Sequence, residues 1–99
     1  MAKTNQEIYN EIVAHMNSEG GLYSNWYAGI TSNIESRLHG DHGVPKTNHW
    51  FMTRPAASSA DARIIEEALH KLGCDGGPGG GDTTSSIVYC YKKTSITNP

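Results

Sequence analysis

The chain has 99 residues, of which 36% are apolar, and this length fits a single domain (1–99) with a small core. Ten acidic and eight basic residues give a net charge of -2, which excludes a global electrostatic attraction to nucleic acid, so a polyanion site must be a local patch. The sequence has no basic-plus-apolar leader and no apolar run of membrane-spanning length, so we expect a cytoplasmic protein with no membrane partner and with Cys74 and Cys90 as free thiols.

The first predicted element is a packing helix over 5–18. Thr4-x-x-Glu7 has the form of a capping box, which marks its start. The exposed face of this helix shows no pattern that would suggest a site. Its apolar positions recur every four residues, at Ile8, Ile12 and Met16.

A strand over 22–31 follows, and Ser24-Asn25 either kinks it or begins it. Strand interiors tolerate glycine poorly, so Gly29 predicts that a neighbouring strand or a ligand approaches the backbone closely. Ser32-x-x-Glu35 has the form of a second capping box and predicts a short helix over 33–39.

The side chains around this turn suggest a phosphate site. Arg37 lies on the short helix, close to the strand end that carries Tyr27, and His42 follows at helical spacing. Tyrosine, arginine and histidine would thus gather on one edge of a small domain.

The second half of the chain also consists of predicted loops, strands and a helix in turn. Residues 40–48 are turn formers, and 49–54 form an apolar, aromatic strand stopped by Pro55. A third helix begins at Ser58 or Ser59 and ends at Gly73. Its buried stripe is predicted to be Ala62, Ile65, Leu69 and Leu72.

A third strand over 86–94 is predicted from the alternation of Ile87, Tyr89 and Tyr91 with the residues between them. The whole order is α-β-α-β-α-β, an α+β fold in which helices pack on a small three-stranded sheet. Residues 1–4 and 95–99 are expected to be frayed.

The glycine-rich run 73–82 is too low in complexity for regular structure, and it lacks the Gly-Lys-Ser/Thr ending of a P-loop. One interpretation is a flexible connection back to the sheet. Alternatively, its backbone amides form an anion nest, although Asp75 and Asp82 at its ends would suit a cation better. The glycines that would contact a ligand are Gly76, Gly77, Gly79 and Gly80.

From Tyr27 to His42 the chain resembles the second half of the GIY-YIG nuclease signature. The matching residues are Tyr27-Ala28-Gly29, Thr31, Asn33, Arg37-Leu38 and His42. The family's next feature is a helix in which a glutamate follows a small residue by four positions and precedes an aliphatic residue by three. Ala62, Glu66 and Leu69 fit that spacing, so the resemblance spans about residues 27–70.

The first strand of the family pattern is missing from its usual place. Gly21-Leu22-Tyr23 lies too close to Tyr27 to form the family's hairpin. The strand over 86–91 would fill the vacant place, as in a circular permutation, with Tyr89 standing in for the first-strand tyrosine. The acidic net charge is another departure, and the family's late asparagine has no clear counterpart.

The resemblance implies metal-dependent phosphodiester hydrolysis. Glu66 would hold Mg²⁺ or Mn²⁺, which polarises the phosphoryl oxygen. Tyr27 or Tyr89 would take a proton from water; a phenol has a reference pKa of about 10, so it needs a nearby cation. Arg37 would supply that cation and also contact the phosphate together with Gly29, while His42 would carry a proton or contact the phosphate.

A non-catalytic binding protein on the same scaffold is the alternative. It would sequester a nucleotide signal or act as an anti-defence inhibitor, as small phage-borne proteins do. The glycine run and the negative charge favour this, because a small ligand needs no broad basic face. Oligomeric state, and the choice between DNA, RNA and a nucleotide, are left open.

A purely structural domain is a third interpretation, in which Glu66 is a solvated carboxylate paired with Arg63 or His70. Trp26, Trp50 and Phe51 are assigned to the core rather than to base stacking. A zinc site is not favoured, because the spacing of His39, His42, Cys74 and Cys90 matches no standard structural site.

Overall fold

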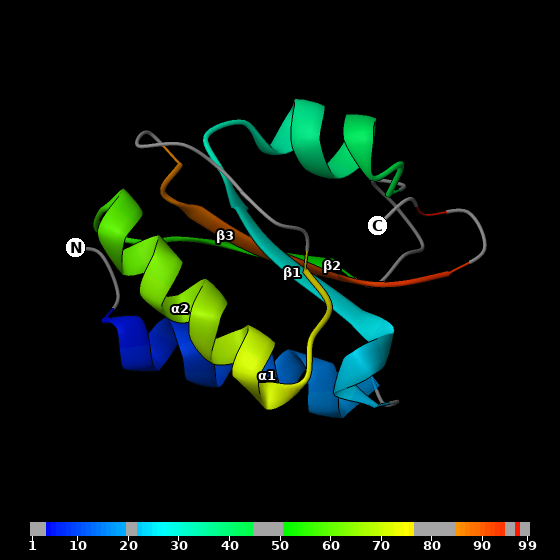
Figure 1. Cartoon of the computed structure of the whole chain (residues 1–99), viewed down its shortest axis with the longest axis horizontal. Helices are drawn as coiled ribbons and strands as arrows, with labels where there is room; N and C mark the ends of the chain where they lie inside the picture. Colours follow the sequence, from blue (N-terminus) through cyan, green and yellow to red (C-terminus); the bar gives the residue numbers. More distant parts are fainter. Residues whose placement is uncertain (1–3, 20–21, 45–50, 77–84, 95–96, 98–99) are drawn as a thin grey trace.

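The computed structural model describes residues 4–19, 22–44, 51–76, 85–94 and 97. This part of the chain has an α+β fold in the predicted order (Figure 1). Its elements are helix α1 (Asn5–Glu19), the 3-10 turn η1 (Tyr23–Asn25), strand β1 (Trp26–Thr31), the π-helix η2 (Glu35–Asp41), strand β2 (Phe51–Pro55), helix α2 (Ser59–Leu72) and strand β3 (Ile87–Lys92).

The last strand is the centre of the sheet. The strand order is β1-β3-β2, and β3 pairs antiparallel with both neighbours. In this register Gly29 lies opposite Tyr89, and Tyr27 lies opposite Tyr91. The prediction that the C-terminal strand lies against the strand of Tyr27 is therefore confirmed.

One face of the sheet packs against α1 and α2, which lie side by side (Figure 1). This face forms the larger core, because the inward positions of both helices meet the even-numbered positions of β1 and β3. Trp26 is fully buried there, as predicted, whereas Trp50 lies outside the described residues. The buried members of this core are Ile8, Ile12, Met16, Trp26, Ala28, Ile30, Ala62, Ile65, Leu69, Cys74, Val88 and Cys90.

The opposite face carries a second, smaller cluster beneath η2. Leu38 from η2 and Val44 after it cover the odd-numbered tyrosines of β1 and β3, and Phe51 packs half-buried at the rim. Every residue of β1 is buried as a result. Since both faces of β1 and β3 are covered, the aromatic residues at alternate positions are enclosed rather than solvated.

The first capping box is confirmed. The Thr4 amide donates to Glu7 Oε1 at 2.9 Å, and the Glu7 amide donates to Thr4 Oγ1 at 3.1 Å. The second predicted capping box, at Ser32 and Glu35, is wrong, because the side chain that caps the short helix is that of Asn33 and not that of Ser32. Asn33 Oδ1 accepts from the Ser36 amide at 3.2 Å. The cap falls there because Thr31 Oγ1 already holds the Asn33 amide at 3.0 Å and so fixes the turn one residue later.

The short helix is a π-helix and ends at Asp41, two residues beyond the predicted range. The His42 amide donates to the Arg37 carbonyl at 3.0 Å, five residues earlier, which gives the wider π turn. Because the turn contains this extra residue, His42 and Arg37 lie at the same end of the sheet.

Helix α2 starts and stops where the sequence indicates. Ser58 Oγ accepts from the Asp61 amide at 3.1 Å, and Gly73 ends the helix with a φ of +130°, which suits a glycine. The buried stripe differs at one position, since Leu72 is only half-buried while Glu66 is buried. Leu72 lies in the last turn, where the chain leaves the helix and no longer packs squarely on the sheet.

The start of the glycine-rich run continues the sheet. Asp75 forms a parallel bridge with Tyr27: its amide donates to the Trp26 carbonyl at 2.8 Å, and its carbonyl accepts from the Ala28 amide at 3.0 Å. The prediction that 73–82 contains no regular structure is wrong at this residue, because the outer edge of β1 offers free backbone partners. Residues 77–84 and 45–50 lie outside the described part. No described helix combines the length and apolar character needed to cross a membrane.

Candidate active site

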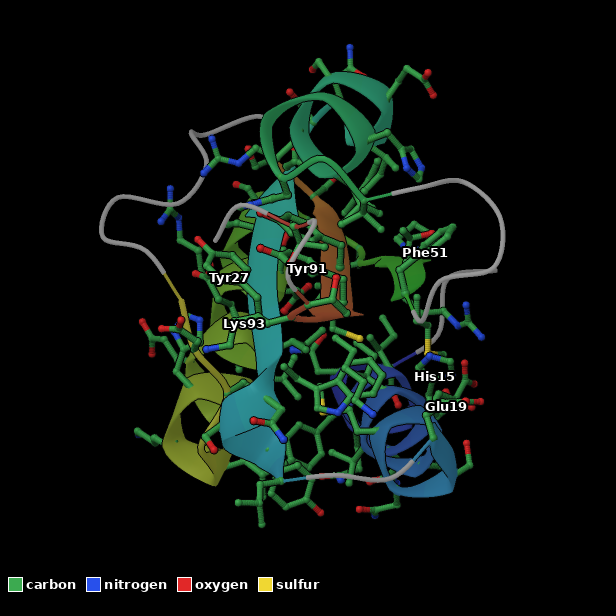
Figure 2. The ribbon with its side chains drawn as sticks, turned by 90° about the vertical axis from the view of Figure 1, so that its right-hand side faces the viewer. His15, Glu19, Tyr27, Phe51, Tyr91 and Lys93 are labelled. Atoms are coloured by element: carbon green, nitrogen blue, oxygen red, sulfur yellow. The ribbon has the colours of Figure 1, made fainter. Side chains whose placement is uncertain are left out.

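Three tyrosines and a histidine form one cluster on the η2 side of the sheet. Figure 2 labels two of its members, Tyr27 and Tyr91. The ring of Tyr27 lies 4.7 Å from that of His42, 5.3 Å from that of Tyr91 and 6.4 Å from that of Tyr89, measured between centroids. Tyr27, His42, Tyr89 and Tyr91 are each at most 5% exposed. We call these four residues the tyrosine–histidine cluster.

Gly29 makes room for this cluster. A Cβ atom at position 29 would lie 2.6 Å from the hydroxyl oxygen of Tyr89 and 2.7 Å from the ring carbon that carries it. The predicted close approach to Gly29 is thus made by the side chain of the neighbouring strand, and the Tyr89 phenol covers the backbone where a ligand was also considered.

His42 links two of the phenols. Its Nε2 lies 2.8 Å from the Tyr89 hydroxyl and its Nδ1 lies 3.1 Å from the Tyr91 hydroxyl. Arg37 joins the same hydroxyl group, because its Nε–H donates to Tyr89 Oη at 3.4 Å. Strands β1 and β3 and the π-helix η2 therefore bring Tyr27, Tyr89, Arg37 and His42 together, although Arg37 and Tyr89 are 52 residues apart in the chain.

Burial governs the acidity of the phenols. It raises the pKa of Tyr89 to about 12, and the hydrogen bond and positive charge of Arg37 oppose this rise without cancelling it. Burial raises the pKa of Tyr91 as well, aided by Tyr27 and Tyr89. Arg37 lowers the pKa of Tyr89 as a nearby cation should, but the net pKa is raised because Tyr89 is 1% exposed and its ionised form is poorly solvated.

Glu66 is a carboxylate of α2, which packs on the opposite face of the sheet from the tyrosine–histidine cluster, and it is near enough to Arg37 and Tyr89 for their charges to influence one another. Glu66 is 8% exposed, and within the described ranges its carboxylate forms no hydrogen bond or ion pair. Burial raises its pKa, while the positive charges of His70, Arg63 and Arg37 lower it. The charge of Glu66 in turn acts on Tyr89, so the carboxylate, the guanidinium and the phenol share one electrostatic environment.

The outer edge of β1 is held by α2 and by the residues after it. His70, one turn beyond Glu66, lies with Nε2 2.9 Å from the Ala28 carbonyl, so this nitrogen carries the proton and donates it. Gly76 packs against the His70 ring, where a Cβ atom would have no space. Glu66 therefore lies on the side of α2 that faces this edge.

Asp75 is engaged within the protein. Its carboxylate accepts from Lys93 Nζ at 3.0 Å and from the Gly76 amide at 2.9 Å, and the Lys93 hydrogen bond lowers its pKa. Among the other predicted contacts of the glycine run, Gly77, Gly79, Gly80 and Asp82 lie outside the described residues.

The described residues contain no group of three or more histidine, cysteine, aspartate and glutamate side chains that could hold a metal ion. The zinc set does not assemble: Cys74 and Cys90 are buried in the α1–α2 core, whereas His42 lies on the opposite face of the sheet. His39 Nδ1 lies 2.7 Å from the Val44 carbonyl. A cation at Glu66 would thus have one protein carboxylate and would take its other oxygens from water and substrate.

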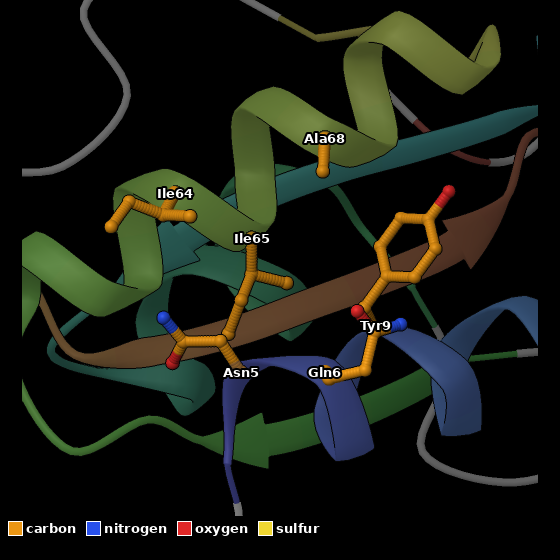
Figure 3. Close-up of a pocket in the computed structure, with 6 residues that line it drawn as sticks. All are labelled: Asn5, Gln6, Tyr9, Ile64, Ile65 and Ala68. Atoms are coloured by element: carbon orange, nitrogen blue, oxygen red, sulfur yellow. The ribbon is translucent and has the colours of Figure 1, made fainter.

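A hollow lies between α1 and α2, on the far side of the sheet from the tyrosine–histidine cluster (Figure 3). Its lining is mostly apolar and carries no group suited to proton transfer at neutral pH. The residues that line it are Asn5, Gln6, Tyr9, Ile64, Ile65 and Ala68. This hollow is separate from the candidate active site.

Comparison of the chain with protein-family models, with curated proteins and with solved structures found no match. The site is therefore interpreted from its own geometry.

Tyr91 was not singled out from the sequence as a site residue. It belongs to the cluster because it lies two residues after Tyr89 on the same face of β3, and the alternation over 86–94 already contained that signal. His70 was considered from the sequence only as an ion-pair partner of Glu66, and its Nε2 lies 2.9 Å from the Ala28 carbonyl.

Proposed function

We propose that this chain is a permuted GIY-YIG-like domain that hydrolyses phosphodiester bonds in nucleic acid with the help of Mg²⁺ or Mn²⁺. The observation that carries the proposal is the convergence of Tyr27, Tyr89, Arg37 and His42 on one face of the sheet. Glu66 lies on α2 toward the edge of β1, within electrostatic reach of Arg37 and Tyr89. The central position of β3 supports the permutation, because Tyr89 reaches the Tyr27 strand from the opposite end of the chain.

Glu66 is the residue suited to hold the cation. Partial desolvation raises the pKa of the Glu66 carboxyl, and a bound cation would favour its ionised form. When bound, the metal would polarise a phosphoryl oxygen and stabilise the leaving oxygen.

Arg37 is suited to stabilise the charge that develops on the phosphate. Its Nε is turned toward Tyr89, so the guanidinium is held beside the phenol that would receive a proton from the attacking water. Guanidinium groups donate in a fixed fork that matches phosphate oxygens.

Nucleic-acid cleavage by the full-length chain tests the proposal. Plasmid DNA, single-stranded DNA and RNA would be incubated with Mg²⁺ or Mn²⁺ and with the wild type, Glu66→Ala or Arg37→Ala. We expect a loss on the order of 100-fold or more in both variants, because each removes a group that stabilises the transition state.

Glu67→Ala is the matched control, since Glu67 is the neighbouring glutamate on α2 and is exposed. Cleavage that survives in Glu66→Ala, or that Glu67→Ala removes equally, would contradict the role of Glu66.

The competing function is nucleotide binding without catalysis. The pKa of Tyr89 favours this function, because a phenol with a pKa of about 12 is protonated at neutral pH and is a hydrogen-bond donor there. Thermal-shift measurements against nucleotides and cyclic nucleotides separate the two functions. Stabilisation by a nucleotide that Arg37→Ala abolishes, with no cleavage of any nucleic acid, would replace the hydrolytic proposal with the binding one.

A further inference from the structure

We infer that Tyr91 is a positioning residue, whose hydroxyl accepts a hydrogen bond from Nδ1 of His42 and so holds His42 in the tautomer whose Nε2 accepts the proton of Tyr89. The tautomer follows from the geometry alone, and its catalytic consequence rests on the proposed function. No part of the sequence interpretation gave Tyr91 a role.

The two nitrogens of His42 have different partners and cannot both play the same part. In a neutral imidazole one nitrogen donates and the other accepts. The Tyr89 hydroxyl lies 2.8 Å from Nε2 and the Tyr91 hydroxyl lies 3.1 Å from Nδ1, and the histidine is 5% exposed. The direction of one hydrogen bond therefore fixes the direction of the other.

Arg37 identifies the direction of these hydrogen bonds, and Tyr91 stabilises it by accepting from Nδ1–H. A guanidinium only donates, so Tyr89 Oη accepts from Arg37 Nε, and the phenolic proton has to find an acceptor elsewhere. Among the described residues, His42 Nε2 lies 2.8 Å from the Tyr89 hydroxyl and is the acceptor within reach of that proton. Tyr89 thus donates to Nε2, and Nδ1–H donates to Tyr91.

This arrangement lets a phenol of low acidity assist the attack of water. Water gives a proton to Tyr89 Oη as its oxygen bonds to phosphorus, and the original phenolic proton passes to His42 Nε2. The bond from phosphorus to the leaving oxygen breaks, and that oxygen takes a proton from solvent. His42 then returns its proton to Tyr89 and Tyr89 releases one to solvent, so no free phenolate forms, in keeping with a pKa of about 12.

The test is the ¹⁵N NMR signature of the His42 ring in the full-length, labelled protein without added metal or substrate. The chain has five histidines, so the His42 signals are assigned as those missing from His42→Asn. We expect a protonated Nδ1 and an unprotonated Nε2 in the wild type, and a mixture of tautomers in Tyr91→Phe. A protonated Nε2 in the wild type, or an unchanged signature in Tyr91→Phe, would overturn the inference.

Tyr23→Phe is the matched control, because it removes a tyrosine hydroxyl that donates to Asn17 Oδ1 at 2.9 Å, away from His42. It should leave the His42 signature unchanged, and a change would show that any lost tyrosine hydroxyl disturbs the ring. Because the wild-type spectrum alone can refute the tautomer, the inference stays testable even if Tyr91→Phe folds poorly.

Kinetics test the catalytic consequence separately. In Tyr91→Phe we expect kcat for nucleic-acid cleavage to fall on the order of 10-fold to 100-fold with KM nearly unchanged, because proton transfer is impaired and binding is not. An unchanged kcat in an active protein would overturn the positioning role. A wild type without activity would refute the proposed function while the NMR result still decides the tautomer.

Discussion

Gly29→Ala is the most direct test of the packing that holds the site together. The added Cβ atom would lie 2.6 Å from Tyr89 Oη and 2.7 Å from its ring carbon, closer than non-bonded atoms approach. The Tyr89 ring covers Gly29 of the neighbouring strand and is 1% exposed, so either the ring or the β1 backbone has to move.

The expected magnitude combines three effects. Overpacking a well-filled site costs about 1–3 kcal/mol. Displacing the Tyr89 hydroxyl from His42 Nε2 weakens a buried hydrogen bond with a net contribution of about 1 kcal/mol. Replacing a strand glycine by alanine returns about 0.5–1 kcal/mol of conformational entropy. The balance is a loss of about 2–3 kcal/mol in the free energy of unfolding.

Urea denaturation followed by circular dichroism measures this loss, and for a domain of this size the melting temperature should fall by about 10–20 °C. Gly40→Ala in η2 is the control of opposite sign: its Cβ would meet only the Glu35 carbonyl oxygen at 3.6 Å, an ordinary contact, so we expect stabilisation by about 0.5–1 kcal/mol. If Gly29→Ala proves as stable as the wild type, the close packing of Tyr89 over Gly29 is refuted.

Two further predictions concern buried titratable groups. Burial raises the pKa of Glu66 in the folded state above its ordinary value of 4.5. Between the ordinary pKa and the raised one, the folded chain therefore binds more protons than the unfolded chain. The free energy of unfolding falls as pH rises through this range. Glu66→Gln should therefore gain stability relative to the wild type as pH rises above 4.5, as measured by urea midpoints, and a difference independent of pH would contradict this. Burial also raises the pKa of Cys74 to about 11 and that of Cys90 to about 12, so a thiol reagent at neutral pH should label both slowly in the native protein and rapidly in denaturant. Fast labelling of either thiol in the native protein would contradict their burial in the α1–α2 core.

The helices and strands of this fold were largely predictable, because residues close in sequence signal where each of them begins or ends. The capping box at Thr4 and Glu7, the Ser58 cap and the Gly73 stop all act within one helical turn, and the structure confirms each of them. Where two polar residues compete for one role, local patterns fail. Ser32 fits the capping pattern, but Asn33 caps the helix because the Thr31 hydroxyl fixes where the turn begins.

The site was predictable only in part, since its chemistry depends on contacts between distant residues. The pattern around Tyr27 indicated Arg37 and His42, and the alternation over 86–94 placed Tyr89 on a strand. The sequence could not show that burial would outweigh the Arg37 charge at Tyr89, because that balance depends on how completely η2 covers the sheet.

Strand β3 is needed both for the sheet and for the tyrosine–histidine cluster. Strands β1 and β2 do not pair with each other, so each depends on β3 for its ladder of hydrogen bonds. The same strand carries Tyr89 and Tyr91, the two phenols that hold His42. Assembly of the sheet and assembly of the tyrosine–histidine cluster are therefore one event, and substitutions that loosen β3 should impair stability and the His42 hydrogen bonds together.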